Sequence, residues 1–292
     1  MYNFIKLKQL DIIKIKIYND LNLIFFNFTN AGGTMRITTI INGKGGVGKT
    51  TTTHALATGI DKTKYKALAI DYDPQGNLSH AFGVDVNNVP TLYHVFRGDL
   101  DVKEAIQHTP QGDILAGNAW LAQLEAMFSG AAYLKSIRKL KTLLSSLEGE
   151  YTHVFIDNQP LIGGILTTQS LASATDLIVP ISAEVFALQG LARLQEAIGE
   201  IKENISPSLR IDGVLLTKLN PRTNISAGLT KAINKWAELE KTKVYKSFIR
   251  ESVSVKEAQV NKQSLFDFAP ESNPSKDYLS FIQEYLETEK AV

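Results

Sequence analysis

The fold of this chain is decided by Gly43-Lys44-Gly45-Gly46-Val47-Gly48-Lys49-Thr50. This stretch fits the pattern G-x-x-x-x-G-K-[ST] at every fixed position. In such loops the backbone N–H groups cradle phosphates, while the distal lysine, here Lys49, reaches the β- and γ-phosphates. The hydroxyl of the last residue, here Thr50, is offered to Mg²⁺. The stretch therefore predicts a phosphate-binding loop, or P-loop.

The sequence on either side of the loop supports this interpretation. Residues 35–41 form a β-branched run that predicts a buried strand, and residues 51–59 predict a helix. A P-loop lies between such elements, and the helix N-terminus adds its N–H groups and its dipole to the anion site. A glycine-rich turn that only connects two elements would explain neither Lys49 nor Thr50.

A second lysine, Lys44, follows the first glycine of the loop. An ordinary P-loop needs only its distal lysine, and a lysine at the loop entrance points away from its own terminal phosphate. We therefore expect Lys44 to cross a dimer interface and to contact a nucleotide held by another subunit.

Two further predicted strands end in aspartates. Residues 67–71 end at Asp71, with Asp73 two residues later, and residues 152–157 end at Asp157. In a doubly wound sheet, ligand chemistry gathers at the carboxyl ends of the strands, so these acids are expected where Mg²⁺ or an attacking water would lie. Asp157 fits the Walker B aspartate, which holds a metal-bound water. Simple turn formation is the alternative for Asp71 and Asp73, because Asp-Pro and Gly-Asn are common in turns.

The rest of the chain alternates strands with helices. Further strands are predicted at residues 176–181 and 211–217, and helices at residues 191–204, 227–241 and 275–289. This alternation predicts an α/β fold, here a P-loop NTPase with a doubly wound, mainly parallel sheet and helices on both faces. We expect residues 35–292 to form one domain.

Composition excludes several classes of protein. The chain has 292 residues, a net charge of +1 and no cysteine. Without cysteine it has no disulfide framework, thiolate nucleophile or iron–sulfur ligand set. No apolar run reaches the roughly 18 residues that span a membrane, so we expect a cytoplasmic protein. Charge is uneven, because residues 206–262 hold eleven basic and five acidic side chains, which fits either a nucleic-acid face or a solvated surface.

Residues 1–34 precede the first predicted core strand and are rich in Ile, Phe, Asn and Lys. They allow three interpretations: a fused arm, an amphipathic membrane anchor, or upstream sequence that is not part of the native protein. The bases that encode residues 31–35 can include a purine-rich ribosome-binding site just before an ATG. We therefore expect Met35 to be the natural start, with a flexible arm as the next interpretation.

Together these motifs resemble those of the ParA/MinD/Soj family of deviant Walker A ATPases, most closely the Soj-like partition ATPases. The resemblance covers roughly residues 35–286. Two specific motifs carry it, residues 44–51 and residues 71–77. Supporting matches are Asp157 with Pro160, residues 183–191, Arg222-Thr223-Asn224 and residues 253–258 after a strand.

The resemblance implies a slow, Mg²⁺-dependent ATPase. Lys44 would reach the partner's nucleotide in an ATP-sandwich dimer, and Asp73 would orient or activate the attacking water. The site residues that it implies fall into three groups: Gly45, Gly46, Val47, Gly48, Lys49, Thr50 and Thr51 bind ATP or ADP; Thr50, Asp157 and Asp71 surround Mg²⁺; Lys44, Lys49 and Asp73 act in catalysis.

For function, the resemblance implies a DNA-segregation ATPase. ATP would join two subunits, the homodimer would bind duplex DNA of the nucleoid without sequence preference, and a centromere-bound ParB-type protein would stimulate hydrolysis and release it. The basic segment 206–262 then becomes the expected DNA face, with Arg222, Lys246 and Arg250 as leading candidates. The alternative is a MinD-like positioning ATPase on a membrane. Such a protein would need a basic amphipathic helix, and residues 275–292 contain more acidic than basic side chains.

The sequence departs from the family pattern at two places. Asn158-Gln159-Pro160 stands where the family usually has a small residue and a double proline, so the switch after Asp157 is expected to move or signal differently. Glu251 and Ser254 occupy positions that are usually basic, which weakens the implied DNA site. Residues 1–34 are also too short for the helix-turn-helix domain that some plasmid relatives carry.

Overall fold

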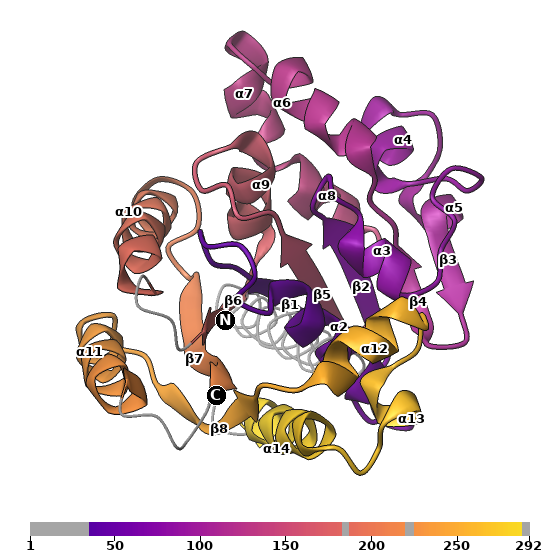
Figure 1. Cartoon of the computed structure of the whole chain (residues 1–292). Coiled ribbons are helices and arrows are strands. Elements are labelled where there is room, and N and C mark those ends of the chain that lie inside the picture. The colour runs from indigo at the N-terminus through magenta and orange to yellow at the C-terminus, as the bar shows by residue number, and fades with distance from the viewer. Residues whose placement is uncertain (1–34, 183–186, 220–224, 288–292) are drawn as a thin grey trace, which may run out of the picture. The chain divides into compact units, whose positions relative to one another are not determined.

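The computed structural model describes residues 35–182, 187–219 and 225–287. The chain divides into two units, Met1–Met35 and Arg36–Val292. All described helices and strands belong to the second unit (Figure 1). The predicted N-terminal extension, residues 1–34, lies outside the described residues.

An eight-stranded sheet organises the second unit. Its strand order is β3-β4-β2-β5-β1-β6-β7-β8, and neighbouring strands are parallel except for the antiparallel pair β3 and β4. The strands are β1 Arg36–Ile40, β2 Ala67–Tyr72, β3 Ile106–Thr109, β4 Gly112–Leu115, β5 His153–Asn158, β6 Asp176–Ser182, β7 Arg210–Leu219 and β8 Val244–Arg250. The prediction of a mainly parallel α/β sheet is confirmed.

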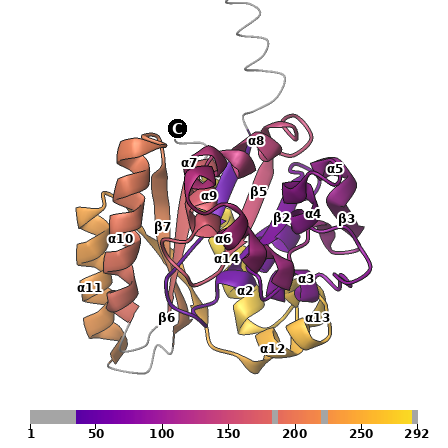
Figure 2. The same ribbon diagram turned by 90° about the horizontal axis from the view of Figure 1, so that it is seen from above.

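Helices connect the strands and cover both faces of the sheet (Figures 1 and 2). The predicted helices in residues 51–59, 191–204, 227–241 and 275–289 correspond to α2, α10, α11 and α14. The helices are α2 Lys49–Gly59, α3 Asn77–Ala81, α4 Leu92–Arg97, α5 Val102–Ala105, η1 Ala119–Ala122, α6 Gln123–Met127, α7 Ala131–Ser136, α8 Lys139–Ser145, α9 Ile165–Ser173, α10 Ala187–Asn204, α11 Ile225–Leu239, α12 Val253–Val260, α13 Leu265–Phe268 and α14 Asn273–Glu287.

Both faces of the sheet are buried because successive side chains of a strand point to opposite sides. Ile178 and Leu215 pack with α2 and α14 in one core cluster. Their neighbours Leu177, Val179 and Val214 pack with α9, α10 and α11 in the other. Figure 1 shows α9 and α10 on one side of the strands and α14 on the other. The near-continuous apolar runs of the central strands are thus explained by burial on two sides.

The edges of the sheet differ most from the sequence prediction. The hairpin of β3 and β4 was not predicted, because each strand has only four residues and is partly exposed, so no apolar run marks it. At the other edge, only Tyr245 and Ile249 of β8 are buried, Lys246 is exposed, and the remaining positions are partly buried. Such edge strands carry polar side chains and give a weak signal in the sequence.

A buried ion network lies at the amino ends of the strands, opposite the P-loop. Arg36, which is 8% exposed, donates from Nε to Asp176 Oδ2 (2.8 Å) and from Nη2 to Asp212 Oδ1 (3.0 Å). Its guanidinium lies 4.0 Å from the ring centroid of Tyr285 in α14. Burial alone would raise the pKa of Asp176, but the guanidinium groups of Arg36 and Arg210 outweigh burial and lower it. The network ties β1, β6 and β7 to α14.

Candidate functional site

The predicted P-loop connects β1 to α2. It passes through two left-handed residues, Gly46 (φ 76°) and Gly48 (φ 90°), where a side chain would be strained. Nothing lies within 4 Å of the position that a Cβ of Gly45 or Gly46 would take, so the loop is open on that side. Asn42 holds the loop entrance, because its Oδ1 accepts the N–H of Lys44 (2.9 Å).

The N-terminus of α2 has no side-chain cap. Its N-cap is Gly48, and no side chain of the described residues accepts a hydrogen bond from the helix at that position. The backbone N–H groups of the first turn, at Lys49, Thr50 and Thr51, therefore lack intrahelical partners and are available to an anion. The open loop and the uncapped helix form one phosphate-sized cradle.

Lys49 is buried in this cradle. It is 6% exposed, and its Nζ donates to the carbonyl oxygen of Lys44 (3.1 Å). Burial lowers the pKa of Lys49, while the carboxylates of Asp157 and Asp73 act in the opposite direction. A phosphate that entered the cradle would offer this ammonium a stronger partner than a single backbone carbonyl.

Asp157 lies at the carboxyl end of β5, in register with Ile40 of β1 and Asp71 of β2. It is fully buried, and neither carboxylate oxygen has a hydrogen-bond partner within the described residues. Burial and the charge of Asp71 raise the pKa of Asp157 well above its usual range, against the effect of the nearby Thr50 and Lys49. A buried carboxylate without a partner is costly, which indicates a missing ligand.

Asp71 is also fully buried, but its carboxylate is engaged. Its Oδ2 accepts the backbone N–H and the hydroxyl of Ser79 in α3, both at 2.7 Å. Burial raises the pKa of Asp71 to about 7, although the two Ser79 donors act against this. Gly117 packs so tightly here that a Cβ would lie 2.2 Å from the Asp71 carbonyl oxygen. Asp71 thus anchors α3 behind the site, next to Asp157.

Asp73 follows β2 and stands at the edge of the site. It is 7% exposed, and its Oδ1 accepts the N–H of Gln75 (2.9 Å). The turn continues to Gly76, whose left-handed backbone (φ 66°) starts α3. Asp73 Oδ2 makes no hydrogen bond to the described residues, so one carboxylate oxygen remains for a water or a ligand.

A cavity of about 950 Å³ opens beside the P-loop and Asp73. On one side its wall is formed by Gly45, Gly46, Gly48, Lys49, Thr50, Thr51 and Asp73. Lys44 is not part of this wall. The opposite wall comes from the carboxyl ends of β7 and β8 and from α12. Its lining includes Thr217, Lys218, Leu219, Arg250, Glu251, Ser252, Val253 and Gln259. The structure thus brings these predicted residues together around one space, whereas Val47, Asp71 and Asp157 are not among the residues that line it.

The second wall was not predicted as part of the site. Lys218, at the end of β7, has a left-handed backbone (φ 51°), and the hydroxyl of the preceding Thr217 donates to the carbonyl oxygen of Val47 in the P-loop (2.7 Å). The rule that ligands collect at the carboxyl ends of parallel strands could have identified these residues. Gln259 and Tyr278 carry no such signal. They contact α2 through Thr51 (3.1 Å) and Thr52 (3.2 Å) respectively.

The segment after Asp157 is held by Glu125 of α6. Glu125 Oε2 accepts the N–H of Ile165 (2.9 Å), which begins α9, and its Oε1 accepts from Gln159 Nε2 (3.4 Å). A Cβ at Gly164 would lie 2.6 Å from Glu125 Oε1, so the helix start fits closely against this carboxylate. The unusual Gln159 noted in the sequence therefore links the switch segment to α6.

The residues fit a magnesium ion that is completed by a nucleotide. Among the described residues, no group of three or more His, Asp or Glu side chains could hold a metal ion by itself. Mg²⁺ commonly takes one or two protein ligands, phosphate oxygens and water. The buried Asp157 carboxylate and the Thr50 hydroxyl, beside an open phosphate cradle, match that requirement.

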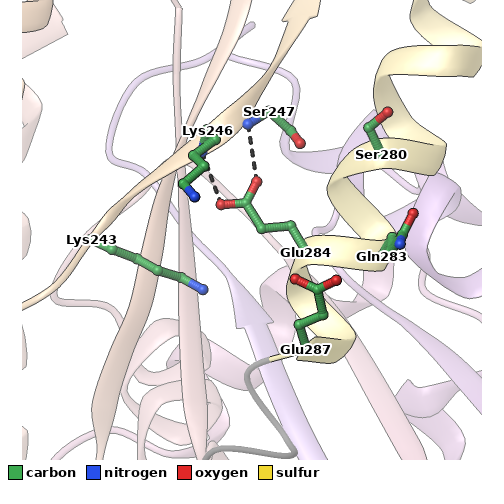
Figure 3. A pocket seen from close by; sticks show the side chains of 7 residues that line it. All are labelled: Lys243, Lys246, Ser247, Ser280, Gln283, Glu284 and Glu287. Atoms are coloured by element: carbon green, nitrogen blue, oxygen red, sulfur yellow. Dashed lines mark hydrogen bonds between the residues drawn. The ribbon is translucent and has the colours of Figure 1, made fainter.

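Two of the three DNA candidates lie within the described residues, and each of the two has an acidic neighbour in α14. Arg222 lies outside the described residues. Arg250 lines the nucleotide cavity, and its guanidinium is held by Asp277 of α14 through Nε (2.9 Å) and Nη2 (2.6 Å). Lys246 is exposed on β8 at a separate cavity of about 430 Å³, where Glu284 accepts its backbone N–H (2.9 Å). Lys243, Lys246, Glu284 and Glu287 are among the residues that line this second cavity (Figure 3).

Comparison with known proteins places the chain in a family. The sequence matches the AAA domain family over residues 35–211. It is 29% identical over 250 residues to the sporulation initiation inhibitor protein Soj of Bacillus subtilis, covering 85% of this chain and 97% of the relative. It is 32% identical over 261 residues to the chromosome partitioning protein ParA of Caulobacter vibrioides, covering 88% and 96%.

Among solved structures, a cobyrinic acid a,c-diamide synthase from Mycobacterium smegmatis, with an ATP analog and magnesium bound, is similar with a TM-score of 0.76. It is 28% identical, and the match covers 88% of this chain and 96% of that chain.

Proposed function

Because the chain belongs to the ParA/MinD/Soj family of deviant Walker A ATPases, we propose that it is a DNA-partition ATPase acting as an ATP-dependent homodimer. One observation carries the proposal: an uncapped P-loop and a buried, unpartnered Asp157 carboxylate face the same end of the sheet. Each lacks a partner that a Mg²⁺–nucleotide complex would supply.

ATP or ADP is bound by the P-loop and the start of α2. The backbone N–H groups of this segment and the Lys49 ammonium hold the phosphates, and Lys49 gives up its contact with the Lys44 carbonyl to do so. Thr50 and Asp157 hold Mg²⁺, with Asp71 behind them. When bound, the ion neutralises charge on the phosphate oxygens. The part of the cavity that the ends of β7 and β8 line would receive the base and sugar.

Hydrolysis needs a positioned water more than covalent chemistry. Asp73 orients the attacking water through the carboxylate oxygen that Gln75 does not use. Lys44 stands outside its own cavity wall, which suits a contact with the nucleotide of a second subunit. ATP hydrolysis that depends on a contact with a second subunit is slow, and slow hydrolysis suits a protein that acts as a timer.

The dimer in its ATP state binds duplex DNA of the nucleoid without sequence preference, and a centromere-binding ParB-type protein stimulates hydrolysis and releases it. DNA is favoured over the membrane surface of a MinD-like protein, because α14 buries Tyr278, Phe281 and Tyr285 in the core, and Leu279 is the one large apolar side chain that α14 exposes. Within the described residues, no helix has the length and apolar character to cross a membrane.

Sedimentation with ATP, with ADP and without nucleotide tests the proposal. We expect ATP-dependent dimers in the unmodified protein, loss of the dimer in Lys44→Ala and Lys49→Ala, and a long-lived ATP-bound dimer in Asp73→Ala. The two lysine variants separate the roles, because Lys49→Ala should lose nucleotide binding whereas Lys44→Ala should keep it. The same oligomer in every variant and nucleotide state would refute the sandwich mechanism.

A further inference from the structure

The positions proposed from the sequence leave the DNA surface without a strong basic patch among the described residues. Arg250 is engaged by Asp277 at the nucleotide cavity, and Lys246 lies beside Glu284 and Glu287. DNA affinity comes mainly from lysine and arginine side chains that neutralise phosphates. A DNA surface therefore requires other basic side chains that are exposed and have no local acidic partner.

The segment of α7 and α8 carries only basic charge. Between Glu125 and Glu148 the sequence contains four basic residues and no acidic residue. Lys135, Arg138 and Lys141 are exposed. The ammonium groups of Lys135 and Lys141 make no ion pair or hydrogen bond with the described residues, and Arg138 makes one contact, from Nη2 to the carbonyl oxygen of Ile205 (3.3 Å).

The buried apolar residues of this segment determine which of its side chains face solvent. Ile137, Leu140 and Leu144 are buried, so the opposite side of the segment must face solvent. The fourth basic residue, Lys139, belongs to the inner side, because its Nζ donates to the carbonyl oxygen of Phe96 (2.5 Å). Lys135 and Lys141 are thus held on packed helices, and Arg138 lies in the short turn between them.

Another run of lysines, at the turn before β2, lacks this property. Lys62 donates to the carbonyl oxygen of Gln111 (2.8 Å), Lys64 pairs with Asp61 (3.0 Å), and Lys66 lies 4.6 Å from the ring centroid of Tyr151. Each of these cations has a local partner. This run has the same charge and similar exposure, which makes it a matched control.

We propose that the exposed face of α7 and α8, through Lys135, Arg138 and Lys141, contacts the phosphate backbone of duplex DNA. This inference rests on the proposed function, in which the ATP-bound protein binds DNA. Lys135 lies in α7, Arg138 in the turn that joins the two helices, and Lys141 in α8, so the three exposed cations follow one another closely along the chain. A membrane fits this face less well, because its apolar residues point inward and Leu134 is its main exposed apolar side chain, at 78%.

The test compares two triple variants by fluorescence anisotropy on a labelled duplex of arbitrary sequence, with ATP, between about 50 and 200 mM salt. The test variant is Lys135→Gln/Arg138→Gln/Lys141→Gln, and the control is Lys62→Gln/Lys64→Gln/Lys66→Gln. The slope of log affinity against log salt should fall by about 0.9 per lost phosphate contact in the test variant, and affinity should drop at least about tenfold. The control should keep most of the slope. Both variants should keep unmodified ATP affinity, which monitors folding.

The outcomes separate this surface from the proposed function. Equal losses in the two variants, or no loss in either, would overturn the surface while leaving DNA binding intact. No DNA binding by the unmodified protein in any nucleotide state would overturn both. Binding of the unmodified protein to phosphatidylserine vesicles that the test variant loses, with unchanged DNA binding, would assign the face to a membrane instead. The single variant Lys141→Gln gives a milder check, since it should lower the slope by about 1.

Discussion

The buried ion network offers a quantitative test of the fold. We expect Arg36→Met to lower the free energy of unfolding by about 3 kcal/mol at neutral pH, at the lower end of the cost of breaking a buried pair. The substitution removes both carboxylate contacts of Arg36, at 2.8 and 3.0 Å. The cost stays at the lower end because each carboxylate keeps another partner: Asp176 keeps Arg210, and Asp212 keeps the hydroxyl of Tyr245.

Arg210→Met is the matched control. Arg210 contacts the same carboxylate, Asp176, but its side chain is 43% exposed, whereas that of Arg36 is 8% exposed. Exposed pairs contribute about 0 to 1 kcal/mol, so the control should lose far less than Arg36→Met. Urea unfolding followed by circular dichroism measures both losses. In a thermal scan the Arg36 variant should melt roughly 6 to 12 °C earlier.

The loss must also depend on pH. The pKa of Asp176 is lowered in the folded protein, so its contribution is present above the pKa of the unfolded chain and is lost as pH falls through the folded value. The gap between the unmodified protein and Arg36→Met should therefore be widest near neutral pH and should close below about pH 4. Losses that are equal for Arg36→Met and Arg210→Met, or that do not change with pH, would refute the reasoning.

Three further predictions concern the site. Gly117→Ala should cost about 2 kcal/mol, because its Cβ would meet the Asp71 carbonyl oxygen at 2.2 Å, whereas Gly199→Ala, with open space in α10, should be neutral or stabilising in the same urea titration. The folded protein holds the Asp71 carboxyl at a pKa of about 7, so ionisation of this carboxyl opposes folding. The stability of Asp71→Asn should therefore rise relative to that of the unmodified protein as pH increases from about 4 to 7. Urea unfolding of Mg²⁺-free protein at both ends of this range measures the difference in stability, and a difference that does not change with pH would contradict the buried site. Glu125→Ala should lower the free energy of unfolding by about 1 to 2 kcal/mol, because it removes the carboxylate at the start of α9. The substitution should also alter the steady-state ATPase rate, because the segment after Asp157 loses its contact with α6. An unchanged rate would show that α6 does not influence this segment.

The sequence predicted the central sheet well, and it marked the glycine-rich loop between β1 and α2, for a physical reason. Strands buried on both faces need continuous apolar runs, and a phosphate cradle needs glycines followed by a lysine and a hydroxyl, so both leave local patterns. The carboxyl-end rule then placed Asp71, Asp73 and Asp157 beside the loop without knowledge of their contacts.

Contacts between distant parts of the chain could not be predicted in the same way. Glu125 contacts Ile165 across 40 residues, and Arg250 meets Asp277 across 27. Nothing in the local pattern of a glutamate or an arginine tells which distant partner it will have. For Arg250 this matters directly, because its charge suggested a DNA contact whereas its packing places it at the nucleotide cavity.

Side chains from the C-terminal third of the chain contact the nucleotide cavity and the helix behind it. Gln259 of α12 and Tyr278 of α14 hold hydroxyls of α2, directly behind the P-loop. Arg250 lines the same cavity and is bound to α14 through Asp277. A substitution at Arg250 therefore acts first on the nucleotide site. Weaker DNA binding by such a variant would follow from weaker ATP binding alone, without any loss of a DNA contact. The cations of α7 and α8 lie outside the cavity wall, so a loss of DNA binding there, with ATP affinity intact, has no such second explanation.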